Sequence, residues 1–398
     1  MSKRRGFRDG AIDQRGENSW RLRYRINGKR YSKAFHGTKS EAQRVLRDLL
    51  HAGDKGEHVA PDKLTVKQWV DHWLSIGAPG GKRRQEVGAR SLERYSDLLR
   101  IHVVPTLGDR PLQQLQSTEI DALYDKLSGK LSGNTLTNLH GVLGACITTA
   151  FRTRKISRNP MLELAKVPSR GEVDHGMVLE EAQLRTLLQG FKSTSLFPIV
   201  ATAAFTGARR NEILALRWDD LNLAHKTLRI ERALEETIKH GLRFKAPKTE
   251  RGKRTIKIDD DLISLLVAER GRHLRIMAGV PDGTAVDLSL VKLPAGALMF
   301  PNPPAPGESF SFTRPRNPRP VTNAFHRKAT RLGFSALRLH DLRGTHETLL
   351  LDRGVPVHVV AARCGHDAAV LLRTYAKRTR KADDSAVDII AAISKGAL

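Results

Sequence analysis

Apolar and polar side chains alternate along the segment 20–26, which is the pattern of a strand with one buried and one exposed face. The apolar face holds Trp20, Leu22, Tyr24 and Ile26, and the opposite face holds Arg21, Arg23 and Arg25. Asn27-Gly28 is a strong hairpin signal, and the segment 31–35 supplies the return strand. The alternation therefore predicts a small sheet near the N-terminus with three arginines on its outer face.

Helical patterns follow this sheet, and two capping boxes mark where helices begin. Thr38 and Glu41 have the capping-box spacing at the start of a helix that we expect to run to about Ala52. Thr65 and Gln68 repeat the spacing after a polar linker. We place that linker at 53–62 and predict further helices over 91–104, 117–127 and 134–151. The segment 62–168 is thus predicted to be an all-helical domain.

A second polar linker, 168–176, precedes the last part of the chain. There Arg209 follows Thr206-Gly207 at the start of an apolar helix pattern, where free backbone N–H groups favour an anion. The segment 227–258 alternates on both sides of a polar turn, so we predict strands with Lys248 near a hairpin tip. A lysine on a loop is by itself most simply a solvated side chain.

Two histidines and a tyrosine complete the candidate chemistry of this region. His340 and Arg343 are three residues apart, so they share one face of the predicted helix in 338–355. Such a pair alone fits a metal site, an acid–base dyad, a phosphate clamp or a solvated basic face. His366 follows a glycine turn, and Tyr375 lies nine residues later. Tyr375 is the single tyrosine after residue 124, although a core aromatic would also fit this position.

The charge of the chain points to a polyanionic partner. Lys and Arg total 68 against 42 Asp and Glu, a formal net charge of +26. Residues 1–50 hold 14 basic and 5 acidic residues, a net of 14 − 5 = +9, so DNA contact is the preferred interpretation of the arginine face over a solvated surface. No apolar stretch is long enough to span a membrane or to follow the basic N-terminus as a signal peptide. With only two cysteines, we expect a reduced, cytoplasmic, DNA-associated protein.

Five short motifs occur in an order that resembles the tyrosine recombinase (phage integrase) family over essentially the whole chain. They are T-G-x-R-x-x-E at 206–212, P-K-T at 247–249, H-x-x-R at 340–343, C-G-H at 364–366, and Tyr375. The chain departs from the family pattern at Cys364, where leucine is common, at Leu371-Leu372, where polar residues are common, and at Lys257, where proline is common. These departures concern local packing and leave the candidate chemistry intact.

The resemblance implies a mainly α fold with small β elements and three domains. These would be an arm-type DNA-binding domain with a three-stranded sheet and one helix (1–57), a helical core-binding domain (62–168) and a mixed α+β catalytic domain (174–398). The implied catalytic set is Arg209, Lys248, His340, Arg343, His366 and the nucleophile Tyr375, with Glu212 in support. The implied DNA-binding residues of the first domain are Arg21, Arg23, Arg25, Lys29 and Arg30. Implied partners are duplex DNA at core and arm-type sites, further copies of the chain in a tetramer, and host DNA-bending and excision factors in a bacterial cell.

The predicted activity is site-specific DNA recombination through a 3′-phosphotyrosine. Two arginines would hold the phosphate oxygens, Lys248 would protonate the leaving 5′-oxygen, and the histidines would orient the phosphate or handle the tyrosine proton. No carboxylate cluster suited to Mg²⁺ and no phosphate-binding glycine loop is present, so we expect neither metal nor ATP. His346-Glu347 lacks the second histidine of a zinc protease motif. Two alternatives stay open: a type IB-like enzyme that nicks and relaxes DNA, and a DNA-binding regulator derived from a recombinase.

Overall fold

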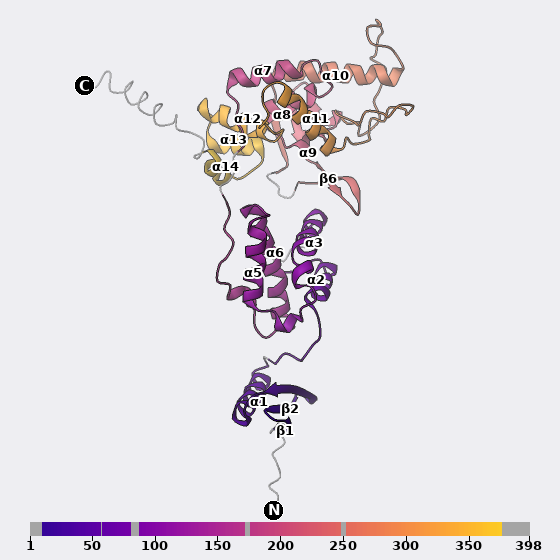
Figure 1. Cartoon of the computed structure of the whole chain (residues 1–398). Helices are drawn as coiled ribbons and strands as arrows, with labels where there is room; N and C mark the ends of the chain where they lie inside the picture. The colour runs from indigo at the N-terminus through magenta and orange to yellow at the C-terminus, as the bar shows by residue number, and fades with distance from the viewer. Residues whose placement is uncertain (1–9, 57, 81–86, 172–175, 248–251, 376–398) are drawn as a thin grey trace, which may run out of the picture. The chain divides into compact units, whose positions relative to one another are not determined.

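The computed structural model describes residues 10–56, 58–80, 87–171, 176–247 and 252–375 (Figure 1). The chain separates into two units, Met1–Val173 and Asp174–Leu398. Both units are mainly helical with small antiparallel sheets, which confirms the predicted fold class. Within the described ranges, no helix is both long enough and apolar enough to cross a membrane.

The first unit begins with a small sheet covered by one helix. Strands β1 (Ala11–Gly16), β2 (Ser19–Ile26) and β3 (Lys29–His36) pair antiparallel in that order, and α1 (Lys39–Asp54) packs against β2. Asn27 and Gly28 both have positive φ, as a two-residue hairpin turn requires. The Thr38–Glu41 capping box is present. Helix α1 continues to Asp54, past the predicted end, and includes Gly53, where a Cβ would lie only 2.6 Å from Cδ1 of Ile26.

A separate helical bundle forms the rest of the first unit. Its helices are α2 (Val66–Ser75), α3 (Ala89–His102), α4 (Val104–Leu107), α5 (Ser117–Ser128) and α6 (Gly133–Arg152). Trp69 and Trp73 are fully buried in its core, and the Trp69 indole N–H donates to the carbonyl of Cys146 at 3.1 Å. The helix predicted over 91–104 ends at His102 instead, because Pro105 lacks an N–H and sits in the first turn of a new helix.

The sheet with α1 and the helical bundle have separate hydrophobic cores. Leu22, Tyr24 and Leu46 belong to the first core, and Trp69 and Trp73 belong to the second. The division of the chain into three domains stays a prediction, since the contacts separate two units. Residues 172–175 of the second predicted linker lie outside the described residues.

The second unit contains short sheets among helices. Its helices are α7 (Glu181–Phe191), α8 (Phe197–Thr206), α9 (Arg210–Ile213), α10 (Asp260–Ala278), α11 (Pro318–Arg331), α12 (Asp341–Asp352), α13 (Val357–Cys364) and α14 (Ala368–Tyr375). Helix α8 is apolar on all sides because it is buried, with α7, α10 and α12 packed against it (Figure 1). Its C-terminal end is where the candidate site is built.

The strands of the second unit correct one prediction. Strands β4 (Leu221–Asn222), β5 (Thr227–Ile230) and β8 (Arg254–Lys257) form one sheet, whereas β6 (Ala233–Thr237) and β7 (Gly241–Lys245) form another. The hairpin turn therefore lies between β6 and β7, at 238–240. The strands before and after Lys248 pair with different partners, so they do not form the predicted hairpin with Lys248 at its tip. Lys248 itself lies outside the described residues.

Candidate active site

The site begins at the turn that ends α8. Gly207 has a φ of 63°, a conformation that favours glycine, and its N–H donates to the carbonyl of Ala203. A Cβ at this position would lie 2.8 Å from Cδ2 of His346 and 2.9 Å from Sγ of Cys364. Glycine is thus required both by the backbone conformation and by the close approach of α12 and α13. The turn brings Arg209 directly beside both helices.

The carbonyl groups at the end of α8 are bound by side chains from distant motifs. Nδ1 of His346 lies 2.9 Å from the oxygen of Ala204, and Nη2 of Arg363 donates to the oxygen of Phe205 at 3.0 Å. Nη1 of Arg343 donates to the oxygen of Gly207 at 2.9 Å. A helix end leaves its last carbonyls without internal partners, so these contacts satisfy them. They also join α8, α12 and α13 into one rigid frame.

His346 is a neutral part of this frame. Burial, followed by the charge of Arg363, lowers the pKa of His346 to about 4. Its Nε2 lies 3.1 Å from the Nε–H of Arg363, so Nε2 accepts that hydrogen bond and Nδ1 carries the proton given to Ala204. Nη1 of Arg363 also donates to the carbonyl of Lys257 at 2.9 Å. Lys257, where the family pattern commonly has proline, therefore contributes its backbone to the frame.

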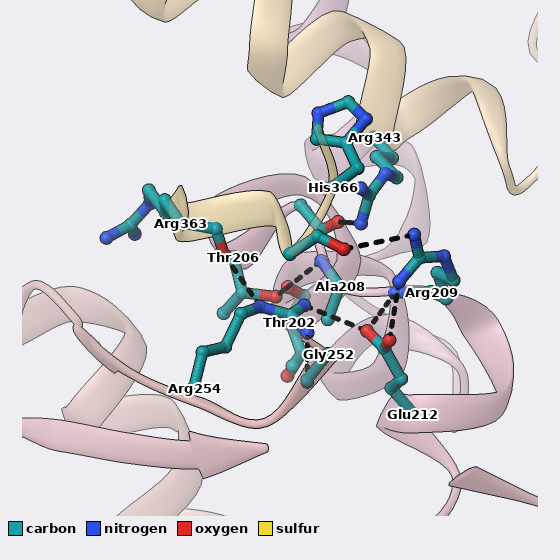
Figure 2. A network of polar contacts seen from close by, with 12 residues as sticks. Thr202, Thr206, Ala208, Arg209, Glu212, Gly252, Arg254, Arg343, Arg363 and His366 are labelled. Atoms are coloured by element: carbon teal, nitrogen blue, oxygen red, sulfur yellow. Dashed lines mark hydrogen bonds and ion pairs between the residues drawn. The ribbon is translucent and has the colours of Figure 1, made fainter. Parts of the chain in front are cut away.

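Glu212 binds two arginines at the start of α9 (Figure 2). One oxygen, Oε1, lies 2.8 Å from Nη1 of Arg209, and the other, Oε2, accepts from the backbone N–H of Arg209 at 2.9 Å. Nη2 of Arg254 donates to Oε2 at 2.8 Å. Burial opposes ionisation of Glu212, but the hydrogen bonds and charges of Arg254 and Arg209 outweigh it and lower the pKa of this carboxyl. Glu212 is therefore a buried carboxylate that holds Arg209.

Arg343 and His366 share a second buried carboxylate, Glu347. Nε of Arg343 lies 3.0 Å and Nε2 of His366 lies 3.3 Å from Oε1 of Glu347. Burial lowers the pKa of Arg343, yet an arginine remains charged at physiological pH. Burial first, and then the charges of Arg343, Arg209 and Arg254, lower the pKa of His366 to about 4. His366 is thus a neutral imidazole close to positive guanidinium groups.

His340 lies at the rim of the same cluster. It is the exposed N-cap residue of α12, and its carbonyl accepts from the backbone N–H of Arg343 at 3.1 Å. Partial desolvation first, and then the charge of Arg343, lower the pKa of His340. The predicted pair of His340 and Arg343 therefore lies at the start of α12, where the histidine is exposed and the arginine is buried. Arg209, Glu212, His340, Arg343 and His366 all belong to one charged cluster, whereas Lys248 lies outside the described residues.

Tyr375 is the last residue of α14, and its side chain lies outside the described part of the structure. Helix α14 is fixed against α13 by Leu371, which is buried with Val360 and Ala361, whereas Leu372 is half exposed. Leu371 thus supplies the packing that anchors the helix carrying Tyr375. Among the described residues, no group of three or more His, Cys, Asp or Glu side chains could hold a metal ion.

Comparison with known proteins decides the family of the chain. The model of the phage integrase family matches residues 177–381, which is just over half of the chain and includes every residue of the cluster. The chain belongs to the phage integrase family. Consistent with this, it is 27% identical to an integrase of Streptomyces ambofaciens, over 96% of this chain and 95% of that relative. It is 25% identical to a XerC-like tyrosine recombinase of Caldanaerobacter subterraneus subsp. tengcongensis, over 85% and 86% of the two chains.

Solved structures of integrases share the fold of this family member. The integrase of the transposon Tn1549, in complex with a circular intermediate DNA, superposes with a TM-score of 0.63 at 18% identity, covering 82% of this chain and 99% of that one. The lambda integrase in a tetramer bound to a Holliday junction gives a TM-score of 0.54 at 16% identity, with coverages of 90% and 94%. The family and the fold together make this chain a site-specific recombinase, as the motif order predicts.

The N-terminal sheet places its predicted DNA-binding residues on two faces. Opposite residues of an antiparallel pair share a face, and Arg25 lies opposite Arg30 while Ile26 lies opposite Lys29. The outer face thus carries Arg21, Arg23, Arg25 and Arg30, all exposed. Lys29 is exposed as well but lies at the end of the other face, opposite Ile26, so its DNA contact stays a prediction that the arginine face does not support. Arg23 is also ion-paired with Asp13 of β1, with Nε 2.7 Å from Oδ2.

Sequence reasoning missed the residues that hold the cluster together: Arg254, Glu347, His346 and Arg363. Glu347 could have been found, because it lies one turn after Arg343 on the same helix. His346 was considered only as part of a metalloprotease motif. Arg254 and Arg363 carry no local signal, since their partners lie 42 and 158 residues away at Glu212 and Phe205. Such contacts become visible only in the fold.

Proposed function

We propose that this chain is a phage or mobile-element integrase that cleaves and rejoins duplex DNA through a 3′-phosphotyrosine on Tyr375. The supporting observation is the pair of guanidinium groups, Arg209 and Arg343, that meet at the end of α8 beside neutral imidazoles. The side chain of Arg209 is 41% exposed and that of Arg343 only 7%. Two fixed cations, one of them accessible, fit a phosphodiester group, because negative charge grows on its non-bridging oxygens during attack.

In the proposed step, the Tyr375 oxygen attacks phosphorus and the bond from phosphorus to the 5′-oxygen breaks. Arg209 and Arg343 hold the non-bridging oxygens, and Lys248 gives a proton to the leaving 5′-oxygen. The tyrosine proton passes to a neutral imidazole, His366 or His340, or to water. One phosphodiester bond replaces another, so rejoining to a new 5′-hydroxyl needs no ATP, and the arginines take the place of a metal ion.

The partners that we propose are duplex DNA and further copies of the chain. The two structural neighbours are bound to DNA, one as a tetramer on a Holliday junction, and this supports a tetramer of the present chain on two core sites. The exposed arginines of the N-terminal sheet suit a second, arm-type DNA site. Native gel mobility and light scattering of the complex with two core-site duplexes would test the tetramer. A complex that never exceeds one chain per duplex would contradict it.

The deciding experiment traps the covalent complex on a nicked suicide substrate and identifies the DNA-linked peptide by mass spectrometry. We expect an adduct on Tyr375, formed in the presence of a chelator, and no adduct from Tyr375→Phe, which keeps DNA binding. An adduct on another residue would contradict the nucleophile assignment. DNA binding without any adduct would favour the regulator, and adduct formation with supercoil relaxation but no strand exchange would favour the type IB-like enzyme.

The role of Lys248 is tested on a substrate whose leaving 5′-oxygen is replaced by sulfur. A thiolate leaves without a proton, so Lys248→Ala should be slow on normal DNA and recover most of the rate on the sulfur substrate. Equal slowing on both substrates would remove Lys248 from the role of general acid.

A further inference from the structure

A buried arginine outside the predicted catalytic set lies directly behind Arg209. Arg254 of β8 binds the same carboxylate as Arg209, but the two side chains differ in exposure: 6% for Arg254 and 41% for Arg209. Glu212 between them is 5% exposed. The carboxylate therefore lies between one exposed and one buried cation, which reach it from different sides (Figure 2).

The hydrogen-bonding groups of Arg254 are directed at the protein. Its Nε donates to the carbonyl of Arg363 at 2.7 Å, and Nη1 donates to the carbonyl of Gly252 at 3.1 Å. Its Nη2 donates to Oε2 of Glu212 at 2.8 Å. A phosphate could reach this guanidinium only after several buried contacts were broken, which would leave polar groups unpaired. Arg254 is therefore not a substrate ligand.

The charges of the three residues explain why a second arginine is useful there. Glu212 holds Arg209 in place, but a carboxylate at 2.8 Å also cancels much of the positive charge that a phosphate would feel. Arg254 compensates that carboxylate from the inside, so the group of three has a net charge of +1 instead of zero. Because the pair of Glu212 and Arg254 is buried, solvent and salt screen it little.

Arg254 also connects two halves of the site. The carbonyl that it binds belongs to Arg363, three residues before His366, and Nη2 of Arg209 lies 3.4 Å from the carbonyl of Gly365 in the same turn. Arg254 and Arg209 each bind Glu212 and a carbonyl of the turn that carries His366. Through these two arginines, β8 and this turn are both linked to Glu212. The geometry points to Arg254 as a positioning residue that keeps Arg209 charged toward the DNA phosphate and fixes His366 beside it. This inference rests on the proposed cleavage function.

The test compares single-turnover cleavage of a suicide substrate at saturating DNA. Arg254→Met should lower the first-order rate about tenfold or more, as expected when a fixed positive charge is removed from the site. Its DNA dissociation constant should change less than about threefold, because Arg254 makes no phosphate contact. Adding Glu212→Gln to Arg254→Met removes the uncompensated carboxylate, so the double variant should cleave faster than Arg254→Met alone.

The double variant distinguishes electrostatic positioning from packing, because a lost packing contact would not be rescued by a second loss in the same place. A wild-type rate for Arg254→Met, or no rescue in the double variant, would overturn the inference. If Arg254→Met does not fold, Arg254→Lys carries the test, since it keeps the cation and should stay within about tenfold of wild type. A larger loss in a folded Arg254→Lys would also overturn the inference.

Two controls separate this inference from the proposed function. Arg232→Met removes another arginine of the second unit that is paired with a buried carboxylate, Asp220, away from the cluster. It should cleave at the wild-type rate per folded molecule. The wild-type protein must itself form the Tyr375 adduct, and its failure to do so would contradict the proposed function. If the wild type forms the adduct and Arg254→Met cleaves at the same rate, only the inference about Arg254 is contradicted.

Discussion

The arginines of the N-terminal sheet and those of the candidate active site carry the same charge in opposite settings. Arg21, Arg25 and Arg30 share one exposed sheet face, so their order follows the alternation of the strands. Arg343 and Arg254 have side chains that are 7% and 6% exposed and are held by carboxylates and backbone carbonyls. An exposed charge is screened by salt and acts in sum with its neighbours, whereas a buried, fixed charge acts through its position.

This difference separates two measurable quantities. Exposed arginines should govern DNA affinity and its dependence on salt, because each phosphate contact releases counterions. Buried arginines should govern the rate of cleavage once DNA is bound, because they stabilise charge that develops in the transition state. Substitutions of exposed arginines should therefore change DNA affinity, and substitutions of buried arginines should change the cleavage rate. A substitution in one region that mainly changes the quantity assigned to the other would weaken the comparison.

The largest effect is expected for Arg343→Ala. It removes a fixed, charged donor from the proposed phosphate site, and a loss of about 10²- to 10³-fold in the first-order cleavage rate is typical for such a donor. The carbonyl of Gly207 and the carboxylate of Glu347 also lose their partner, so the melting temperature should fall. The slope of DNA affinity against salt should decrease by no more than the one phosphate contact that Arg343 makes, about 0.9, so the loss of cleavage rate is the larger effect.

Arg343→Lys is the matched variant, because it keeps the charge but not the planar pair of donors. It should fold better than the alanine variant and still cleave slowly. Cleavage near the wild-type rate in either variant, measured on protein shown to be folded, would contradict the role of Arg343.

Local patterns in the sequence were sufficient for the elements but not for the contacts between them. The alternation at 20–26, the Asn27-Gly28 turn and both capping boxes predict structure correctly, because each depends on neighbours within a few residues. The face of Lys29 also follows from the sequence, since a two-residue turn after Ile26 sets these two residues opposite each other. The hairpin at Lys248 could not be excluded locally, because β7 and β8 alternate alike and differ only in their distant partners.

For the candidate site as well, the sequence predicts the residues but not the contacts between them. The motifs predict which residues belong to the cluster, and its described members do lie together. The exposure of Arg209 beside the burial of Arg343, and the use of Arg254 and Arg363 as internal supports, depend on how α8, α12, α13 and β8 pack. No periodicity or spacing encodes that packing.

An intermediate effect is expected from pH, through His346. Its pKa falls from 6.5 to about 4 on folding, so below pH 6.5 the unfolded chain binds a proton that the folded chain excludes. Above pH 6.5 the protonation of His346 therefore does not lower the free energy of unfolding. As the pH falls from 6.5 toward 4, that free energy decreases. Between pH 7.5 and 5.5 the free energy of unfolding should fall by roughly 1 kcal/mol on account of His346.

Urea unfolding at the two pH values measures this change, with His346→Asn as the comparison. Asparagine keeps a donor for the Ala204 carbonyl but does not titrate, so the variant should show a smaller loss at pH 5.5 than the wild type. An identical loss in both proteins would assign the pH dependence to other groups, His366 among them.

A smaller effect is expected for Arg21→Ala on the sheet. The slope of the logarithm of DNA affinity against the logarithm of salt concentration should decrease by about 0.9 for a lost phosphate contact. The rate of cleavage at saturating core-site DNA should not change. Fluorescence anisotropy with duplex DNA at several salt concentrations measures the slope, and a full slope together with slow cleavage would reverse the comparison between the two regions.

The smallest effect, and the one that tests the sheet face most directly, is expected for Asp13→Asn. Asp13 is ion-paired with Arg23 across β1 and β2, with side chains 33% and 56% exposed, so it draws one cation of the face away from DNA. Exposed pairs of this kind are worth about 0.2–1 kcal/mol, so DNA binding should tighten by only about two- to fivefold. Glu17→Gln is the matched control, because it removes the same charge from the turn between β1 and β2 and leaves the pair of Asp13 and Arg23 intact. Equal tightening in both variants would mean that only net charge matters, and tightening confined to Asp13→Asn would locate the DNA contact on the arginine face.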